Sequence, residues 1–123
     1  MIINCTPHVV DVYGPDAPGT IPEGAEVAVV LSIPPSGMVA RIDERLLDGF
    51  DLAPRVGAEA VEVLRVEYGH VIGLPDVKPK AWYVVSLPVA LAVPARPDLL
   101  VPYRQVRNAR GTVIGCRGFA RPC

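Results

Sequence analysis

Proline and glycine interrupt this chain along its whole length, and their spacing limits every regular element to a short run. The 123 residues include 14 prolines and 11 glycines. Proline has no backbone N–H and breaks helix interiors and central strands, so long helices are excluded. Valine, whose branched side chain packs well in strands, occurs 20 times. The sequence therefore predicts a protein built mainly from short β-strands.

Several segments show the alternating or continuous apolar pattern of short strands. They are Ile2–Asn4, Val9–Tyr13, Ala25–Ile33, Met38–Ile42, Val61–Glu67, Val71–Ile72 and Trp82–Val85. Two segments between them have a different pattern. Asp43–Ala53 is ambiguous and can hold one helical turn around Glu44–Leu47, whereas Tyr68-Gly69-His70 is typical of a turn.

A short helix and a loop are expected after the Trp82–Val85 strand. Ser86 is a suitable cap for a helix that runs through Val93. Pro88 falls in its first turn, where a missing N–H costs nothing. Residues 95–102 contain two further prolines and are expected to form a loop.

The clearest local signal is a hairpin close to the C-terminus. Tyr103–Arg107 and Thr112–Phe119 flank Asn108-Ala109-Arg110-Gly111, whose final glycine fits a type I turn followed by a left-handed residue. Short strands separated by turn signals predict a small barrel or sandwich. We therefore expect a mainly β fold, or an α+β fold with dominant strands and one short helix, as a single domain over residues 1–123.

Nothing in the sequence predicts export or membrane insertion. No run of about 18 apolar residues is present, so no transmembrane helix is expected. The N-terminus lacks the basic, apolar and small-residue order of a signal peptide. The three cysteines are an odd number, which does not suit a disulfide framework. We expect a soluble cytoplasmic protein with free thiols.

Charge is distributed unevenly along the chain. Residues 1–50 hold seven acidic residues and two arginines, whereas residues 96–123 hold six arginines and one acidic residue, Asp98. Two interpretations stay open. The two ends can neutralise each other within one fold, or the arginines can form a basic surface that meets an anion, since arginine presents a planar fork suited to phosphate.

The opening segment Ile3-Asn4-Cys5-Thr6-Pro7-His8 resembles the Asn-Leu-Thr-Pro-His start of a family of small, uncharacterised proteins. These proteins occur in bacterial genomes, notably actinobacterial ones, and in phages and prophages. Further matches are Ile33-Pro34-Pro35-Ser36-Gly37, Tyr83-Val84-Val85-Ser86, Arg96-Pro97-Asp98-Leu99 and Ile114-Gly115-Cys116-Arg117. Cys5 departs from the leucine of the family, which argues against a ligand role for its thiol. The resemblance implies a phage-linked setting and no settled activity.

His8 and Cys116 are the candidate catalytic residues. A histidine can act as a base, a ligand or a proton switch, and it can equally fix a bend through its ring N–H. Cys116 would need a nearby base to lower its pKa and act as a nucleophile; otherwise it is a buried apolar thiol. Cys5, His8, Cys116 and Cys123 do not have the spacing of a zinc unit. We expect no metal and no cofactor.

The candidate ligand-binding residues are His8, Tyr68, His70, Arg96, Arg107 and Arg117. An aromatic ring and an imidazole at a turn are well placed to contact a ligand. In Arg96-Pro97-Asp98, the two charges either form a local ion pair that staples the loop or leave Arg96 facing an anion.

The sequence carries no phosphate loop, nucleophile elbow or zinc-protease motif. The low aromatic content and the acidic first half argue against nucleic-acid binding. We expect a non-enzymatic binding module, in the phage-linked setting that the resemblance implies, which recognises a small anionic ligand or a protein partner. The alternative is a small hydrolase or transferase that uses His8 with Cys116 or an acidic residue. The oligomeric state stays open.

Overall fold

The computed structural model describes residues 1–47, 55–56, 59–60 and 64–122. The strands are β1 (Ile2–Asn4), β2 (Val10–Val12), β3 (Leu31–Ile33), β4 (Arg41–Leu46), β5 (Arg55–Val56), β6 (Glu59–Ala60), β7 (Val66–Ile72), β8 (Trp82–Val84), β9 (Leu99–Arg107) and β10 (Val113–Ala120). One short helix, α1, spans Leu87–Ala92. Among the described residues, no helix is long and apolar enough to cross a membrane.

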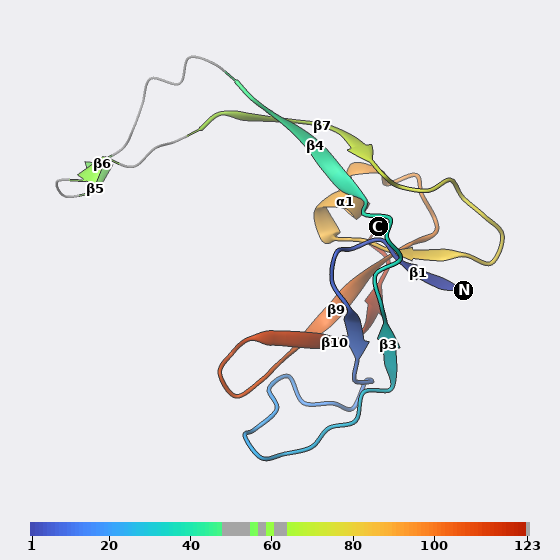
Figure 1. Ribbon diagram of the computed structural model, residues 1–123, viewed down its shortest axis with the longest axis vertical. Helices are drawn as coiled ribbons and strands as arrows, with labels where there is room; N and C mark the ends of the chain where they lie inside the picture. The colour runs from blue at the N-terminus through green and yellow to red at the C-terminus, as the bar shows by residue number, and fades with distance from the viewer. Residues whose placement is uncertain (48–54, 57–58, 61–63, 123) are drawn as a thin grey trace.

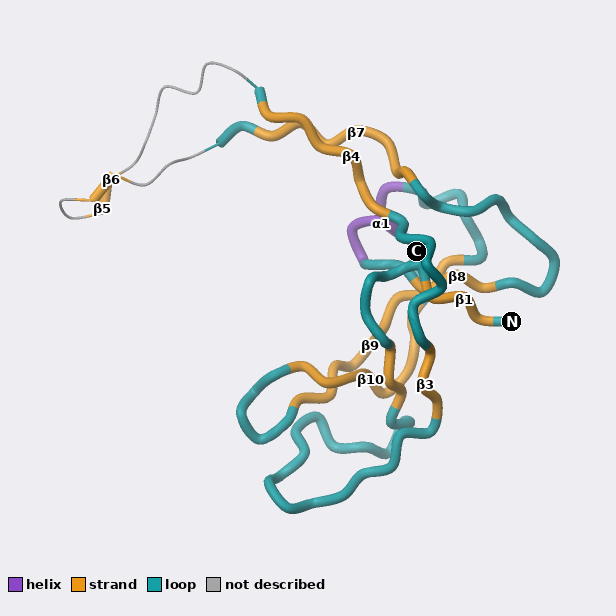
Figure 2. Tube along the Cα trace, viewed as in Figure 1, coloured by secondary structure: helices purple, strands orange, loops and turns teal. Residues whose placement is uncertain are grey.

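Six strands form one sheet in the order β1-β8-β9-β10-β2-β3. The two end strands meet at a bridge between Asn4 and Pro35. There the N–H of Ser36 donates to the carbonyl oxygen of Asn4 over 3.0 Å. The sheet therefore curls into a nearly closed barrel (Figures 1 and 2). The prediction of a mainly β fold, a small barrel with one short helix, is confirmed.

Strand β8 separates two apolar cores, because successive side chains of a strand point to opposite faces. Val84 packs inside the barrel. Its core partners are Val10, Val12, Ile33 and Cys116. Tyr83 and Val85 face the other way, toward a second core that includes Val89 of α1. The helix therefore covers the outside of the barrel next to β8.

Strands β4 and β7 form a separate antiparallel ribbon, here called the arm, which leaves the barrel beside α1 (Figure 1). The predicted helical turn around Glu44–Leu47 is wrong, because this segment pairs as a strand; residues 48–53 of the expected segment lie outside the described residues. The predicted turn at Tyr68-Gly69-His70 is also wrong. Gly69 and His70 fall at a register shift within β7, so the glycine marks a β-bulge instead of a reversal.

The long apolar run Ala25–Ile33 contributes only its last three residues to a strand. Val29 and Val30 are exposed in a loop, so the prediction of a buried strand across the whole run is wrong. The predicted Met38–Ile42 strand begins only at Arg41. The apolar run lacks a partner along most of its length, and composition alone does not reveal that.

The predicted Val61–Glu67 strand is displaced toward the C-terminus. It begins at Val66 and runs to Ile72, while residues 61–63 lie outside the described residues. The expected loop over residues 95–102 is too long, since β9 begins at Leu99. Pro102 is tolerated within β9, where it lies opposite Phe119 of β10.

The local signals near the C-terminus are confirmed. Ser86 is the N-cap residue of α1 and Pro88 falls in the first turn, although the Ser86 side chain makes no capping hydrogen bond. Strands β9 and β10 pair as the predicted hairpin. Gly111 has a φ of +83°, the left-handed conformation that its turn position requires.

Candidate ligand-binding groove

A groove of about 470 Å³ brings together the two ends of the chain. His8, which follows β1, and Cys116 of β10 both line it, so the two candidate catalytic residues share one site. Val9, Val10, Val85, Pro102 and Val113 supply apolar walls, and Thr6, Pro7, Ser86, Gln105 and Gly115 complete the lining. Among the described residues that line the groove, none is acidic.

Asn4 holds the bend that carries His8. Its side chain is buried, and its Nδ2 donates to the carbonyl oxygens of His8 at 2.7 Å and of Ile33 at 3.0 Å. Its Oδ1 accepts from the backbone N–H of Thr6 at 2.9 Å and from the Thr6 hydroxyl at 2.6 Å. The bend is therefore fixed through backbone groups, and the His8 ring takes no part in it.

The rim of the groove carries polar side chains with spare hydrogen-bonding capacity. His8 and Ser86 are exposed, and in the described part of the chain neither side chain makes a hydrogen bond. Gln105 is exposed and its Oε1 accepts from Nη2 of Arg107 at 2.9 Å. His8 and Ser86 can therefore donate to a bound molecule without giving up an existing partner.

Cys116 lies at the floor of the groove and behaves as a buried thiol. Its Sγ donates weakly to the carbonyl oxygen of Asp11 over 3.7 Å. Burial raises the pKa of the Cys116 thiol, an effect opposed by backbone hydrogen bonds from Tyr103 and Gly118 and reinforced by the Asp11 carboxylate. The thiol therefore stays protonated at neutral pH, which does not suit a nucleophile.

Arg96 does not contribute to this groove. Its Nε and Nη2 each donate to Asp98 at 2.9 Å, and Nη2 also donates to the carbonyl oxygen of Pro75 at 2.8 Å. Its guanidinium lies 6.0 Å from the centroid of the Tyr83 ring. The hydrogen bond from Arg96 holds the pKa of Asp98 below its ordinary value. Of the two interpretations of Arg96-Pro97-Asp98, the structure therefore has the local ion pair between Arg96 and Asp98.

Arg107 and Arg117 lie on the terminal hairpin and do not themselves line the groove. Arg107 donates to the carbonyl oxygen of Gly111 at 2.8 Å and to Gln105. Arg117 donates over 3.5 Å to the carbonyl oxygen of Ala17, while its buried Nε has no hydrogen-bond partner among the described residues. Within the described residues, neither arginine forms an ion pair with a carboxylate.

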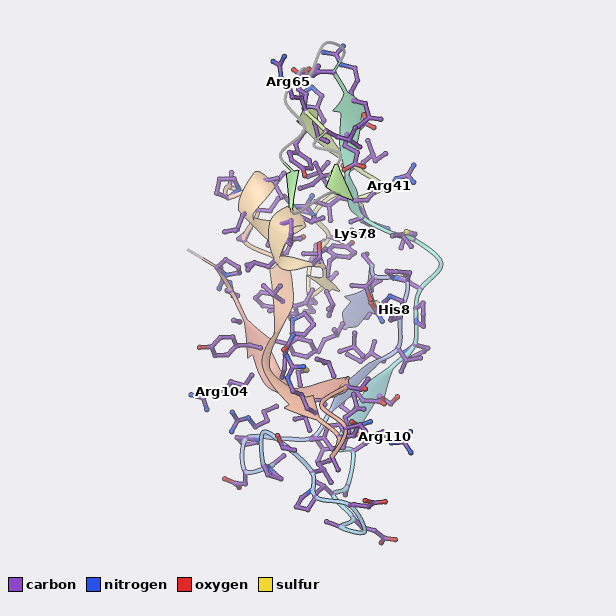
Figure 3. The ribbon with its side chains drawn as sticks, turned by 90° about the vertical axis from the view of Figure 1, so that its left-hand side faces the viewer. His8, Arg41, Arg65, Lys78, Arg104 and Arg110 are labelled. Atoms are coloured by element: carbon purple, nitrogen blue, oxygen red, sulfur yellow. The ribbon has the colours of Figure 1, made fainter. Side chains whose placement is uncertain are left out.

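One loop of the acidic first half lies beside the basic hairpin near the C-terminus. The backbone N–H of Ile21 donates to the carbonyl oxygen of Arg107 at 2.8 Å, and the N–H of Arg107 donates to Gly19 at 2.9 Å. This places the loop that holds Asp16 and Glu23 against the hairpin. Figure 3 shows Arg104 and Arg110 near this loop, with Arg41 and Arg65 far away at the arm. Described arginines thus lie both at the hairpin end of the molecule and at the arm.

Tyr68 and His70 lie on the arm and do not line the groove. Ser86, Gln105 and Asn4 are not among the sequence-based site residues. In the sequence, capping alone accounts for Ser86, and no local pattern marks Gln105. The signal for Asn4 is its place at the end of a strand, two residues before Thr6, because such side chains bond nearby backbone in bends.

Cys5 is buried in the core beside α1, and burial raises its pKa. Cys5 and Cys116 are both free thiols, while Cys123 lies outside the described residues. In the ranges that the structure describes, no three histidine, cysteine or acidic side chains come together to hold a metal ion. No family model, curated protein or solved structure matches this chain, so the comparisons do not test the resemblance to phage and bacterial proteins.

Proposed function

We propose that this protein is a non-enzymatic binding module whose groove holds a small ligand with an apolar body and an anionic group. The observation that carries the proposal is the combination of two donors, His8 and Ser86, with apolar walls. Within the part of the chain that the structure describes, neither donor has a partner and no lining residue is acidic. The ligand's apolar body packs against the valines and prolines, and its anionic group lies at the rim.

The size and chemistry of the groove support this assignment. Ligand sites typically have volumes of about 300–1,000 Å³ and are mostly apolar, with a few polar groups that fix orientation. The groove has this composition. A hydrogen bond whose acceptor is ionised is charge-assisted and roughly twice as strong as a neutral one. His8 therefore favours a carboxylate or phosphate over an alcohol of the same shape.

The enzymatic alternative has weaker support. A cysteine nucleophile works as a thiolate, whereas burial raises the pKa of Cys116. A histidine base is usually oriented by a third group, and the groove lining supplies no carboxylate for His8. These two observations favour binding without turnover. The phage-linked setting and the cytoplasmic location stay predictions; the free Cys5 and Cys116 are in keeping with a reducing compartment.

Matched anionic and neutral probes test the proposal. Thermal shift and ligand-observed NMR would compare octanoate with octanol, and phenyl phosphate with phenol. We expect the anionic member of at least one pair to bind more tightly, and His8→Gln to weaken it by about tenfold, the loss of one charge-assisted hydrogen bond.

Two valines of equal exposure provide a matched control. Val113 lines the groove and is 43% exposed, while Val29 lies outside it and is 42% exposed. Val113→Asp places an acid in the wall and should abolish binding of the anion, whereas Val29→Asp should leave it unchanged. Failure of all four probes to bind, or equal effects of the two variants, would refute the assignment of this groove.

A further inference from the structure

The arm has a free edge along β4. Within the described residues, β4 and β7 form a two-stranded sheet with no third strand. Figures 1 and 2 show the arm reaching away from the barrel. An isolated two-stranded ribbon is only marginally stable in water, and stable sheets need three or more strands or a covering helix. Helix α1 contacts the arm, and Leu46 and Tyr68 of its outer part are exposed among the described residues.

One face of the arm carries partly or fully exposed apolar side chains on either side of Glu44. Ile42 and Val71 pair across the ribbon and pack against the core beside α1. Leu46 and Tyr68 lie on the same face further out, because alternate residues and directly paired residues share a face. Leu46 is 61% exposed and Tyr68 is 68% exposed. The opposite face carries the ion pair between Arg45 and Glu67.

The backbone geometry shows which residues turn toward the free edge. The N–H of Leu47 donates to the carbonyl oxygen of Arg65 at 2.9 Å, so Leu47 and Arg45 face β7. Residues 42, 44 and 46 therefore turn their N–H and C=O groups away from β7. Two residues before Ile42, the N–H of Ala40 is already occupied, because it donates to the carbonyl oxygen of Cys5 at 3.0 Å. The free edge of β4 thus spans residues 42–46 and is centred on Glu44.

We propose that two copies of this chain associate by pairing β4 with β4 of the second copy, antiparallel about a twofold axis at Glu44. This register uses the whole free edge, because residues 42–46 are symmetric about Glu44. Strand β7 is the poorer edge, since the bulge at Gly69 and His70 breaks its ladder. The result is a four-stranded antiparallel sheet shared between the copies.

The side chains are complementary in this register. Asp43 lies opposite Arg45 of the second copy, and the twofold axis repeats the pair. Ile42 lies opposite Leu46 of the second copy, which keeps both apolar faces on the same side of the shared sheet. Opposite charges and apolar residues directly across two strands stabilise pairing. Glu44 meets its own copy at the axis, a local cost that the two flanking ion pairs offset.

The shared sheet also gives the exposed Leu46 of each copy an apolar neighbour in the other copy. Leu46 of the second copy comes beside Ile42, at the base of the arm, where α1 lies. A twofold interface of this kind is self-complementary, so no other partner is needed to complete it.

Charge reversal at the two paired positions tests the register. Sedimentation velocity would measure self-association of the full chain over a range of concentrations. Asp43→Arg sets two arginines opposite each other, and Arg45→Asp sets two aspartates opposite each other. Each variant alone should therefore associate about tenfold or more weakly than the wild type. When the two variants are mixed, the new arginine of one lies opposite the new aspartate of the other, and the unchanged Arg45 and Asp43 also face each other. Both pairs then carry opposite charges, so a heterodimer should form.

Arg65→Asp is the matched control, because it makes the same charge change on an exposed arm residue that does not lie at the β4 edge. It should leave association unchanged, and unchanged melting curves would show that all three variants fold. In a Cys123→Ser background, Glu44→Cys should form a disulfide-linked dimer on mild oxidation, whereas Glu67→Cys on β7 should not. The proposal would be overturned if the wild type stayed monomeric at every concentration, and the β4 edge would then have a different partner. It would also be overturned if mixing the two charge-reversal variants did not restore association.

Discussion

The side chain of Asn4 donates to the carbonyl oxygen of Ile33, 29 residues further along the chain, over 3.0 Å. The same amide group donates to the carbonyl oxygen of His8. One buried side chain therefore ties the closing strands of the barrel to the bend that carries the groove histidine. The barrel closure and the binding site depend on the same residue.

Asn4→Ala should destabilise the protein by about 2–4 kcal/mol, because it leaves two carbonyl oxygens and the Thr6 N–H without their buried partner. Urea unfolding followed by Trp82 fluorescence would measure the change. Ser32→Ala removes an exposed hydrogen bond to Asp11 and should cost about 0.5 kcal/mol or less. Equal costs for the two variants would contradict the role given to Asn4.

Protonation of Asp98 at low pH should lower the free energy of unfolding. Because Arg96 lowers the folded-state pKa of Asp98, its contribution is fully present above the ordinary value of 3.8. It is lost as pH falls through the lowered folded-state pKa, since the unfolded chain then binds the proton more readily. Urea unfolding at about pH 7 and about pH 2.5 should show a smaller acid-induced loss for Asp98→Asn than for the wild type.

The same ion pair predicts unequal costs for its removal. Arg96→Met leaves the buried Asp98 carboxylate uncompensated and should cost about 3 kcal/mol at neutral pH. Glu67→Gln breaks the exposed ion pair with Arg45 and should cost about 0.5 kcal/mol or less. If neither substitution changes the free energy of unfolding, the Arg96–Asp98 ion pair does not stabilise the protein.

Two glycines predict opposite degrees of tolerance. A Cβ on Gly115 would meet the carbonyl oxygen of Asp11 and lie 2.7 Å from Cε2 of Tyr13, so Gly115→Ala must displace backbone and should cost about 3 kcal/mol or more. Gly111 has a positive φ but open space, so Gly111→Ala should cost about 1 kcal/mol. Thermal melts of the two variants would reveal the difference, and the reverse order would contradict the pairing of β10 with β2.

Cys5 and Cys116 should resist alkylation in the folded protein. Both thiols are buried, and burial raises the pKa of each, so little thiolate is present at neutral pH. Iodoacetamide treatment followed by peptide mass mapping should modify both residues in urea and neither in native buffer. Rapid native alkylation of Cys116 would instead support the enzymatic alternative.

The sequence alone determined the features that depend on neighbouring residues. Prolines and glycines spread along the chain restrict element length wherever they occur, which is why a small, mainly β fold could be predicted. Ser86 and Pro88 marked the start of α1. Gly111 marked the hairpin, since only the local backbone decides whether a turn needs a positive φ.

Only the tertiary structure decided which distant segments meet. The apolar run before Ile33 remains mostly outside the sheet, and Tyr68-Gly69-His70 becomes a bulged strand, because a strand exists only where a partner offers hydrogen bonds. Cys116 reaches the groove of His8 through the parallel pairing of β10 with β2. Such pairings join residues about a hundred positions apart, and local periodicity carries no information about them. They depend on which closed arrangement buries the most apolar surface while satisfying the backbone.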